Sequence, residues 1–291
     1  MPVFDYIVCP LCGSALHRDE RTILCEKGHA FDIAKTGYVN LLPPGKEKNA
    51  RTGDEKIMVK ARVDFLAKDF YASISDKTAE VLRPYLTEGG AFADLGCGEG
   101  YHTCRIAEKV ELPITAFGFD ASKYAAEYAS KRSKAMGYLP KEGVGAENDS
   151  PVEAYFFPAN LFHLPLSDHT LDAAVSMFAP IAGEETHRIL KPGGKLIVVS
   201  SGREHLLELR QLIYDEVHFS DASVAVPQGF AMVQQIPFRY TFTLTSREDI
   251  ESLFVMTPFY YKTTEKGRER LLSREELTLT ADVNFTVFGA L

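Results

Sequence analysis

The chain has 291 residues, 45% of them hydrophobic, which is enough for one large domain and a small appendage around a well-filled core. A formal net charge of −8, from 32 basic and 40 acidic residues, argues against broad, sequence-independent binding to nucleic acid. The sequence has no apolar run of membrane-spanning length and no signal segment, and its five cysteines do not form the even framework of a secreted disulfide protein. We therefore expect a cytoplasmic protein in a reducing compartment, with no membrane partner.

The N-terminal segment, residues 1–45, is predicted to be a small zinc-binding domain. A Cys-x2-Cys pair presents two thiolates to one ion, and a second pair from the far side of a hairpin completes a tetrahedron. Because a closed four-ligand site has no open position for a reactive water, the zinc is expected to be structural. Ordinary buried cysteines are the alternative, and His17 is a weaker candidate ligand. The four predicted ligands are Cys9, Cys12, Cys25 and His29.

Residues 46–90 are predicted to form a linker and two helices that lead into the main domain. Leu41-Leu42-Pro43-Pro44-Gly45 is followed by a polar, basic stretch, as is typical of a linker. Helical spacing of apolar residues begins at Asp54, and a second helix is expected from Tyr71 to Leu86. Two basic patches either guide RNA into one cleft or belong to a solvated, mixed-charge surface. They comprise Lys46, Lys48, Arg51, Lys56, Lys60 and Arg62, then Lys123, Lys131, Arg132 and Lys134.

From residue 91 to 291, alternating strands and helices predict an α/β fold with a doubly wound, parallel sheet. The expected strands are 91–95, 114–120, 152–157, 171–177 and 196–200, with helices after Tyr101 and over 123–136. The last third differs, with helices around 206–213 and 250–256 and strands at 238–244 and 277–288. This order predicts antiparallel C-terminal strands. Residues 143–151 are glycine-rich and polar, which predicts an exposed insertion.

Between the first strand and its helix lies a loop with the sequence Asp94-Leu95-Gly96-Cys97-Gly98-Glu99-Gly100. Its glycines let the backbone approach a cofactor, because glycine has no Cβ. Asp120, twenty positions beyond the loop, is placed to accept hydrogen bonds from ribose hydroxyls. Tyr101 stands where a dinucleotide site needs a small residue, so S-adenosylmethionine, which has no phosphate, is the better ligand. For the glycines alone, a tight structural turn is the alternative.

Other segments follow strands at the same edge of the sheet, where ligands bind in such folds. Asn160-Leu161 is predicted to contact the adenine ring, and Phe178-Ala179-Pro180 closes the next strand. The run Leu190-Lys191-Pro192-Gly193-Gly194-Lys195 is more typical of a plain structural turn.

With both motifs in place, the chain resembles the RlmA family of bacterial 23S ribosomal RNA guanine-N1 methyltransferases almost from end to end. The most specific stretches are 31–42, Gly53-Asp54, 205–218, Met256-Thr257-Pro258-Phe259 and Asp282-Val283-Asn284-Phe285. The resemblance implies a Rossmann-like methyltransferase sheet, zinc on the four ligands above and a zinc domain that helps to grip an RNA hairpin. It also implies donor contacts from Tyr71, from the Gly98-Glu99 region and from His205.

Guanine N1 carries a proton and is paired inside a duplex, so the resemblance predicts base extrusion, proton removal and in-line attack on the donor methyl. Asp54, Asp282 and His205 are candidates for the proton acceptor, in no firm order. Phe178 and Phe259 are candidates for stacking on the extruded base, and each is equally a candidate for the core.

Two other classes compete with a ribosomal RNA methyltransferase. A small-molecule methyltransferase has little reason to carry the zinc domain, and a non-catalytic RNA-binding or assembly protein has little reason to carry a complete donor site. The sequence leaves open which guanine is modified and whether the chain forms a homodimer.

Overall fold

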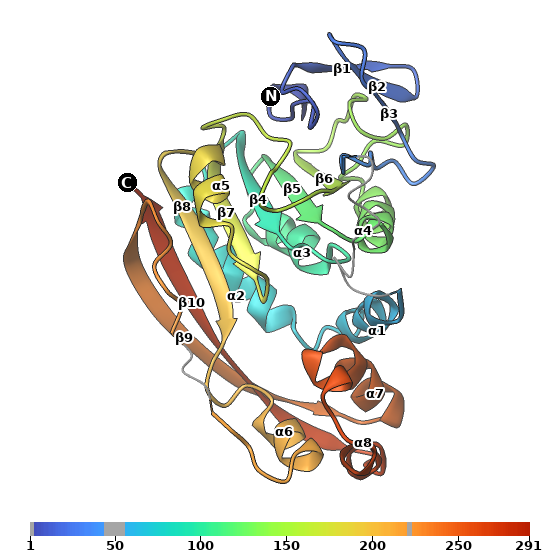
Figure 1. Ribbon diagram of the computed structural model, residues 1–291, viewed down its shortest axis with the longest axis vertical. Coiled ribbons are helices and arrows are strands. Elements are labelled where there is room, and N and C mark those ends of the chain that lie inside the picture. Colours follow the sequence, from blue (N-terminus) through green and yellow to red (C-terminus); the bar gives the residue numbers. More distant parts are fainter. Residues whose placement is uncertain (1–2, 44–55, 220–222) are drawn as a thin grey trace.

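The computed structural model describes residues 3–43, 56–219 and 223–291. These residues are built around one seven-stranded sheet (Figure 1). The strand order is β6-β5-β4-β7-β8-β10-β9, with parallel pairing from β6 through β8 and β10 antiparallel to both β8 and β9. The predicted doubly wound sheet with antiparallel C-terminal strands is confirmed. The strands are β4 Gly90–Leu95, β5 Ile114–Asp120, β6 Val152–Pro158, β7 Leu171–Met177, β8 Leu190–Ser201, β9 Phe230–Leu244 and β10 Leu277–Ala290.

Helices cover the two faces of the sheet unequally. Helices α1–α4 and α6–α8 contribute buried side chains to the core on one face, and α5 is the one described α-helix that contributes on the other. All six residues of β4 are buried, as expected for a central parallel strand with both faces covered. The helices are α1 Lys56–Leu66, α2 Ala72–Leu82, α3 Tyr101–Lys109, α4 Lys123–Ala135, α5 Gly183–Ile189, α6 Leu207–Ile213, α7 Arg247–Met256 and α8 Glu265–Leu272.

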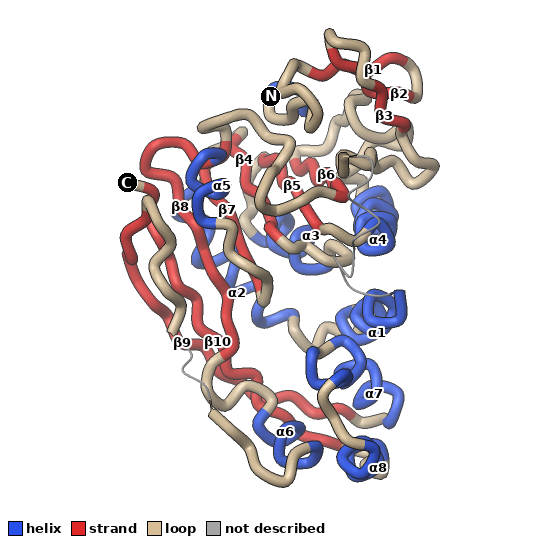
Figure 2. The backbone as a smooth tube through the Cα atoms, in the orientation of Figure 1, coloured by secondary structure: helices blue, strands red, loops and turns tan. Residues whose placement is uncertain are grey.

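The N-terminal unit covers much of the second face. Its strands β1 Leu16–Asp19, β2 Thr22–Cys25 and β3 Ala30–Asp32 form a small antiparallel sheet. The Tyr6 ring packs 5.1 Å from Phe117 of β5, and Ile7 pairs with Leu166 in an antiparallel bridge. Loops, drawn tan in Figure 2, lie between this unit and β4–β6. The small unit and the large domain therefore share one core.

The predicted exposed insertion at 143–151 is wrong for its first two residues. Gly143 and Val144 are buried, and the Val144 amide donates to the Gly37 carbonyl at 3.2 Å. The Arg18 guanidinium donates to the Gly143 and Val144 carbonyls at 3.3 and 3.0 Å. The segment is a contact between the two parts of the chain, and only its later residues reach solvent.

Several element boundaries differ from those expected. Helix α2 ends at Leu82 and continues as the 3-10 turn Arg83–Tyr85, because Pro84 has no N–H to continue the helix. Strand β8 begins at Leu190, so the run predicted to be a plain turn is an irregular start of that strand. Helices α5 and α8 were not expected. In the described part of the chain, no helix is long and apolar enough to span a bilayer.

Candidate metal centre and active site

The four predicted zinc ligands converge on one point. Their ligand atoms all lie within 4.8 Å of one another. The Cys12 and Cys25 sulfurs are 3.7 Å apart, and His29 Nδ1 lies 3.3 Å from Cys25 Sγ and 3.5 Å from Cys9 Sγ. A tetrahedron with Zn–S of about 2.3 Å and Zn–N of about 2.0 Å has edges of roughly 3.5–3.8 Å, so the donor set fits a structural zinc ion.

Two tight turns hold the ligands in register. The Gly13 amide donates to the Cys9 carbonyl and the Gly28 amide to the Cys25 carbonyl, each at 2.8 Å. Both glycines have positive φ, which lets the chain reverse around the metal. His17, the weaker candidate, lies exposed on β1 opposite Leu24 and outside the cluster.

The glycine loop joins β4 to α3 at the carboxyl edge of the sheet. A Cβ on Gly96 would lie 2.5 Å from the Ala179 Cβ, so only glycine fits there. The Gly98 amide donates to Asp120 Oδ2 at 3.0 Å, and the Ser122 amide donates to Asp120 Oδ1 at 2.8 Å. The structure therefore brings Asp120 directly beside the loop, as the spacing predicts.

Asp94, at the end of β4, provides the best test of whether a cationic cofactor fits. Its side chain is buried, and Thr103 Oγ1 donates to Oδ2 at 2.6 Å. Its Oδ1 has no hydrogen-bond partner among the described residues. Burial raises the pKa of Asp94 to about 7. A buried carboxylate with an unused acceptor suits a ligand that carries an ammonium and a sulfonium, as S-adenosylmethionine does.

The other residues predicted to contact the methyl donor lie in three different environments. Leu161 lies against the loop, with Cδ1 4.0 Å from where a Cβ on Gly96 would stand. Asn160 Oδ1 accepts from the Phe162 amide at 3.1 Å. The buried carboxylate of Glu99 accepts from Arg132 Nη2 at 3.1 Å and so is held toward α4.

Near the same edge, Tyr71, Phe178, His205 and Asp282 meet, although they are far apart in sequence. Tyr71 Oη lies 3.4 Å from His205 Nε2, and the Phe178 ring stacks on the imidazole at 5.6 Å. His205 Nδ1 accepts from the Asp282 amide at 3.3 Å. Burial lowers the pKa of His205 to about 4, against the opposing effect of Asp282, so the ring is neutral at pH 7.

This arrangement bears on the proton-acceptor candidates. With Nδ1 occupied by a backbone N–H, neutral His205 carries its proton on Nε2 and has no lone pair left to accept another. Asp282 Oδ2 accepts from the Glu204 amide at 2.8 Å. Asp54 lies outside the described residues. Phe259 packs edge-to-face on Tyr214 rather than joining this group.

One residue near the glycine loop has a different environment from the one that the sequence predicted. Arg62 of α1 was predicted as part of a basic patch, yet its Nη1 lies 3.2 Å from where a Cβ on Gly98 would stand. Only the helical phase of α1 hinted that this side chain faces inward.

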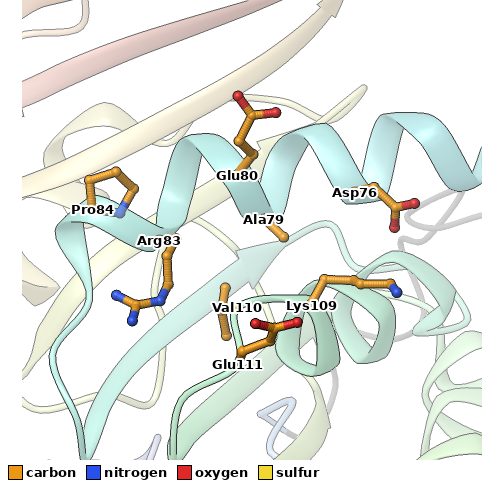
Figure 3. A pocket seen from close by; sticks show the side chains of 8 residues that line it. All are labelled: Asp76, Ala79, Glu80, Arg83, Pro84, Lys109, Val110 and Glu111. Atoms are coloured by element: carbon orange, nitrogen blue, oxygen red, sulfur yellow. The ribbon is translucent and has the colours of Figure 1, made fainter.

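A separate cavity of about 340 Å³ between α2 and α3 shares no residue with the loop, and its lining mixes acidic and basic side chains (Figure 3).

The sheet order, the glycine loop and the acid beside it define the chain as an S-adenosylmethionine-dependent methyltransferase, here with an N-terminal zinc ribbon. Residues 7–51 match the family model described as "RlmA, N-terminal", and residues 93–198 match a methyltransferase domain. A candidate 23S rRNA (guanine-N1)-methyltransferase of Micromonospora griseorubida is 30% identical over 306 residues, covering 97% of this chain and 96% of that protein. The chain therefore belongs to the RlmA family.

Two further relatives differ in what they share with the chain. The 23S rRNA (guanine(748)-N(1))-methyltransferase of Streptomyces fradiae is 34% identical over 209 residues, covering 71% of this chain and 67% of that protein. The 2-phytyl-1,4-naphtoquinone methyltransferase of Nostoc punctiforme is 28% identical over 129 residues, which cover 42% of this chain and 51% of that protein. Similarity along nearly the whole chain is thus found with the candidate ribosomal RNA methyltransferase of Micromonospora griseorubida, whereas the naphtoquinone enzyme matches less than half of the chain.

Proposed function

We propose that this protein transfers the methyl group of S-adenosylmethionine to N1 of a guanine in a hairpin loop of 23S ribosomal RNA. The observation that supports the proposal is that the zinc ribbon packs on the same sheet that carries the donor loop, which gives a large substrate a second surface to bind. A small-molecule methyltransferase needs no such surface, and the naphtoquinone enzyme resembles less than half of the chain. The RNA substrate implies a cytoplasmic enzyme.

For the donor, we propose distinct roles for the residues at the carboxyl edge. The backbone at Gly96, Gly98 and Gly100 lies along the methionine part and the ribose, and Asp120 accepts from the ribose hydroxyls. Asn160 and Leu161 border the adenine. The donor's charged end lies near Asp94, with Tyr71 and His205 closing the pocket, while Glu99 acts through its ion pair with Arg132.

For the acceptor, we propose extrusion of the guanine toward the Phe178–His205 side of the site. When bound, S-adenosylmethionine supplies an activated methyl group, so the chain's own task is to align N1 and to remove its proton. The Asp282 carboxylate and Asp54 remain the candidates for accepting that proton. Asp282→Asn should lower kcat at neutral pH and recover toward wild-type rates as pH rises, because N1 then ionises in solution.

The substrate class is tested by offering labelled S-adenosylmethionine with 23S rRNA, 16S rRNA or a pool of small metabolites. We expect label in 23S rRNA alone. The affinity of the protein for that RNA should fall steeply as the salt concentration increases. Label in metabolites and in neither RNA would replace the proposal with the small-molecule alternative. RNA binding without any label transfer would indicate a non-catalytic protein.

A further inference from the structure

The backbone of Phe178 is held in an unusual conformation. Its φ is +52°, in the left-handed region that bulky side chains rarely adopt. The Phe178 amide donates to the Val199 carbonyl at 2.9 Å, and Ser176 Oγ donates to the Ala179 carbonyl at 3.2 Å. The fold thus maintains a strained turn that directs an aromatic ring away from the core, because 44% of Phe178 remains exposed.

A rigid support lies behind this ring. Phe178 stacks on His205 with ring centres 5.6 Å apart and planes 30° from parallel. His205 is only 9% exposed and is fixed at both ring nitrogens, by the Asp282 amide at 3.3 Å and by Tyr71 Oη at 3.4 Å. Tyr71 in turn packs edge-to-face on Phe65 and Phe242. Contacts from four separate parts of the chain therefore fix the orientation of one exposed ring.

The residue that follows Phe178 in the chain touches the methyl-donor loop. Ala179, the next residue, approaches Gly96 so closely that a Cβ there would lie only 2.5 Å from its own. With one face against His205, the opposite face of the ring is the accessible one. An accessible aromatic face that is supported from behind, on the residue adjoining the one that touches the methyl-donor loop, is suited to stacking a planar base.

We propose that Phe178 stacks on the extruded guanine during methyl transfer, with His205 and Tyr71 as positioning residues that hold the ring. The inference rests on the proposed function, since it requires an RNA base as the acceptor. Removing the aromatic ring from a base–aromatic stack weakens binding of the nucleic acid about 5- to 150-fold. Phe178 thus sets how tightly the acceptor base is held, independently of contacts to the RNA backbone.

The test compares two RNAs, a 23S hairpin that the wild-type protein methylates and the same hairpin with an abasic ribose at the target position. We expect the wild-type protein to bind the intact hairpin at least fivefold more tightly, and Phe178→Leu to bind the two RNAs equally. Phe178→Asn lacks the ring but tolerates the left-handed backbone, and it should behave like Phe178→Leu if that variant fails to fold. Phe178→Tyr keeps an aromatic ring and should therefore retain the wild-type preference for the intact hairpin over the abasic one.

Controls separate stacking from general effects. Phe219→Leu removes an equally exposed ring, 45% against 44%, and should change affinity for both RNAs by the same factor. His205→Leu should lose the preference, and the double variant with Phe178→Leu should lose no more. If Phe178→Leu and Phe178→Asn keep the wild-type preference while the wild-type protein methylates the hairpin, the stacking role is wrong and the proposed function stands. If the wild-type protein methylates no 23S hairpin, both are wrong.

Discussion

Removing zinc should destabilise the whole protein and not only its N-terminal unit. The perturbation is His29→Ala, which deletes one of the four metal ligands. Without the ion the small unit lacks enough apolar burial to stay folded. Because Tyr6 packs on Phe117 and Ile7 pairs with Leu166, unfolding of the unit also uncovers the sheet.

The size of the effect follows from the aromatic side chains on that face. Four rings at 1% exposure or less belong to the core shared with the zinc unit. Exposing half of each ring costs about 1 kcal/mol per ring, or about 4 kcal/mol together. A chain of 291 residues loses about 1.6 °C in Tm per kcal/mol, so we expect a Tm lower by about 6 °C. The rings belong to Phe117, Phe119, Tyr155 and Phe157.

Calorimetry of the wild-type protein, His29→Ala and His17→Ala tests this. His17 is a matched control, since it is an exposed histidine of the same unit that lies outside the cluster of four ligands. We expect His17→Ala to melt within 1 °C of wild type, and chelator treatment of wild type to reproduce His29→Ala. If His29→Ala leaves the main melting transition unchanged and removes only a separate, smaller transition, the two parts fold independently. That result would refute the reasoning.

Three further predictions concern the donor site and pH. Asp120→Ala should weaken S-adenosylhomocysteine binding in calorimetry by about 10- to 100-fold, because the loop amide of Gly98 and the ribose lose their acceptor; unchanged affinity would remove Asp120 from the site. Asp94, with its pKa raised to about 7, should make S-adenosylmethionine binding about eightfold tighter at pH 7.5 than at pH 6, and Asp94→Asn should abolish the difference. Burial lowers the pKa of His102 to about 3 and of His205 to about 4, so the unfolded chain binds more protons below pH 6.5 and stability is lost as pH falls. Denaturant melts should show about 2 kcal/mol lost per histidine between pH 7 and 5, and a smaller loss in His102→Asn; an equal loss in that variant would exclude His102 as a cause.

Local patterns predicted the parts of the fold that depend on neighbouring residues. The buried run of β4, the glycine loop and the acid Asp120 each have a signature within about 30 residues. The same holds for the zinc ligands, whose spacing along the chain was enough to predict that they cluster. By contrast, α5 and α8 are seven and eight residues long, too short for helical periodicity to distinguish them from loops.

Contacts between distant segments were not predictable from pattern. Tyr71 and His205 are 134 positions apart, and only resemblance to a family suggested a role for either. The burial of Val144 depends on the zinc unit docking against it, which a polar, glycine-rich sequence does not reveal. Arg62 was predicted to belong to a basic patch, either one that guides RNA or a solvated surface, because its neighbours in sequence are basic. Packing of α1 instead brings its side chain to the glycine loop.

The central claim is that one guanine N1 in 23S ribosomal RNA is the methyl acceptor. The most direct measurement is labelled methyl transfer from S-adenosylmethionine to unmodified 23S rRNA, followed by nuclease digestion and mass spectrometry. We predict 1-methylguanine at a single hairpin position. A different methylated nucleoside, or no label in RNA while zinc and donor are both bound, would contradict the account.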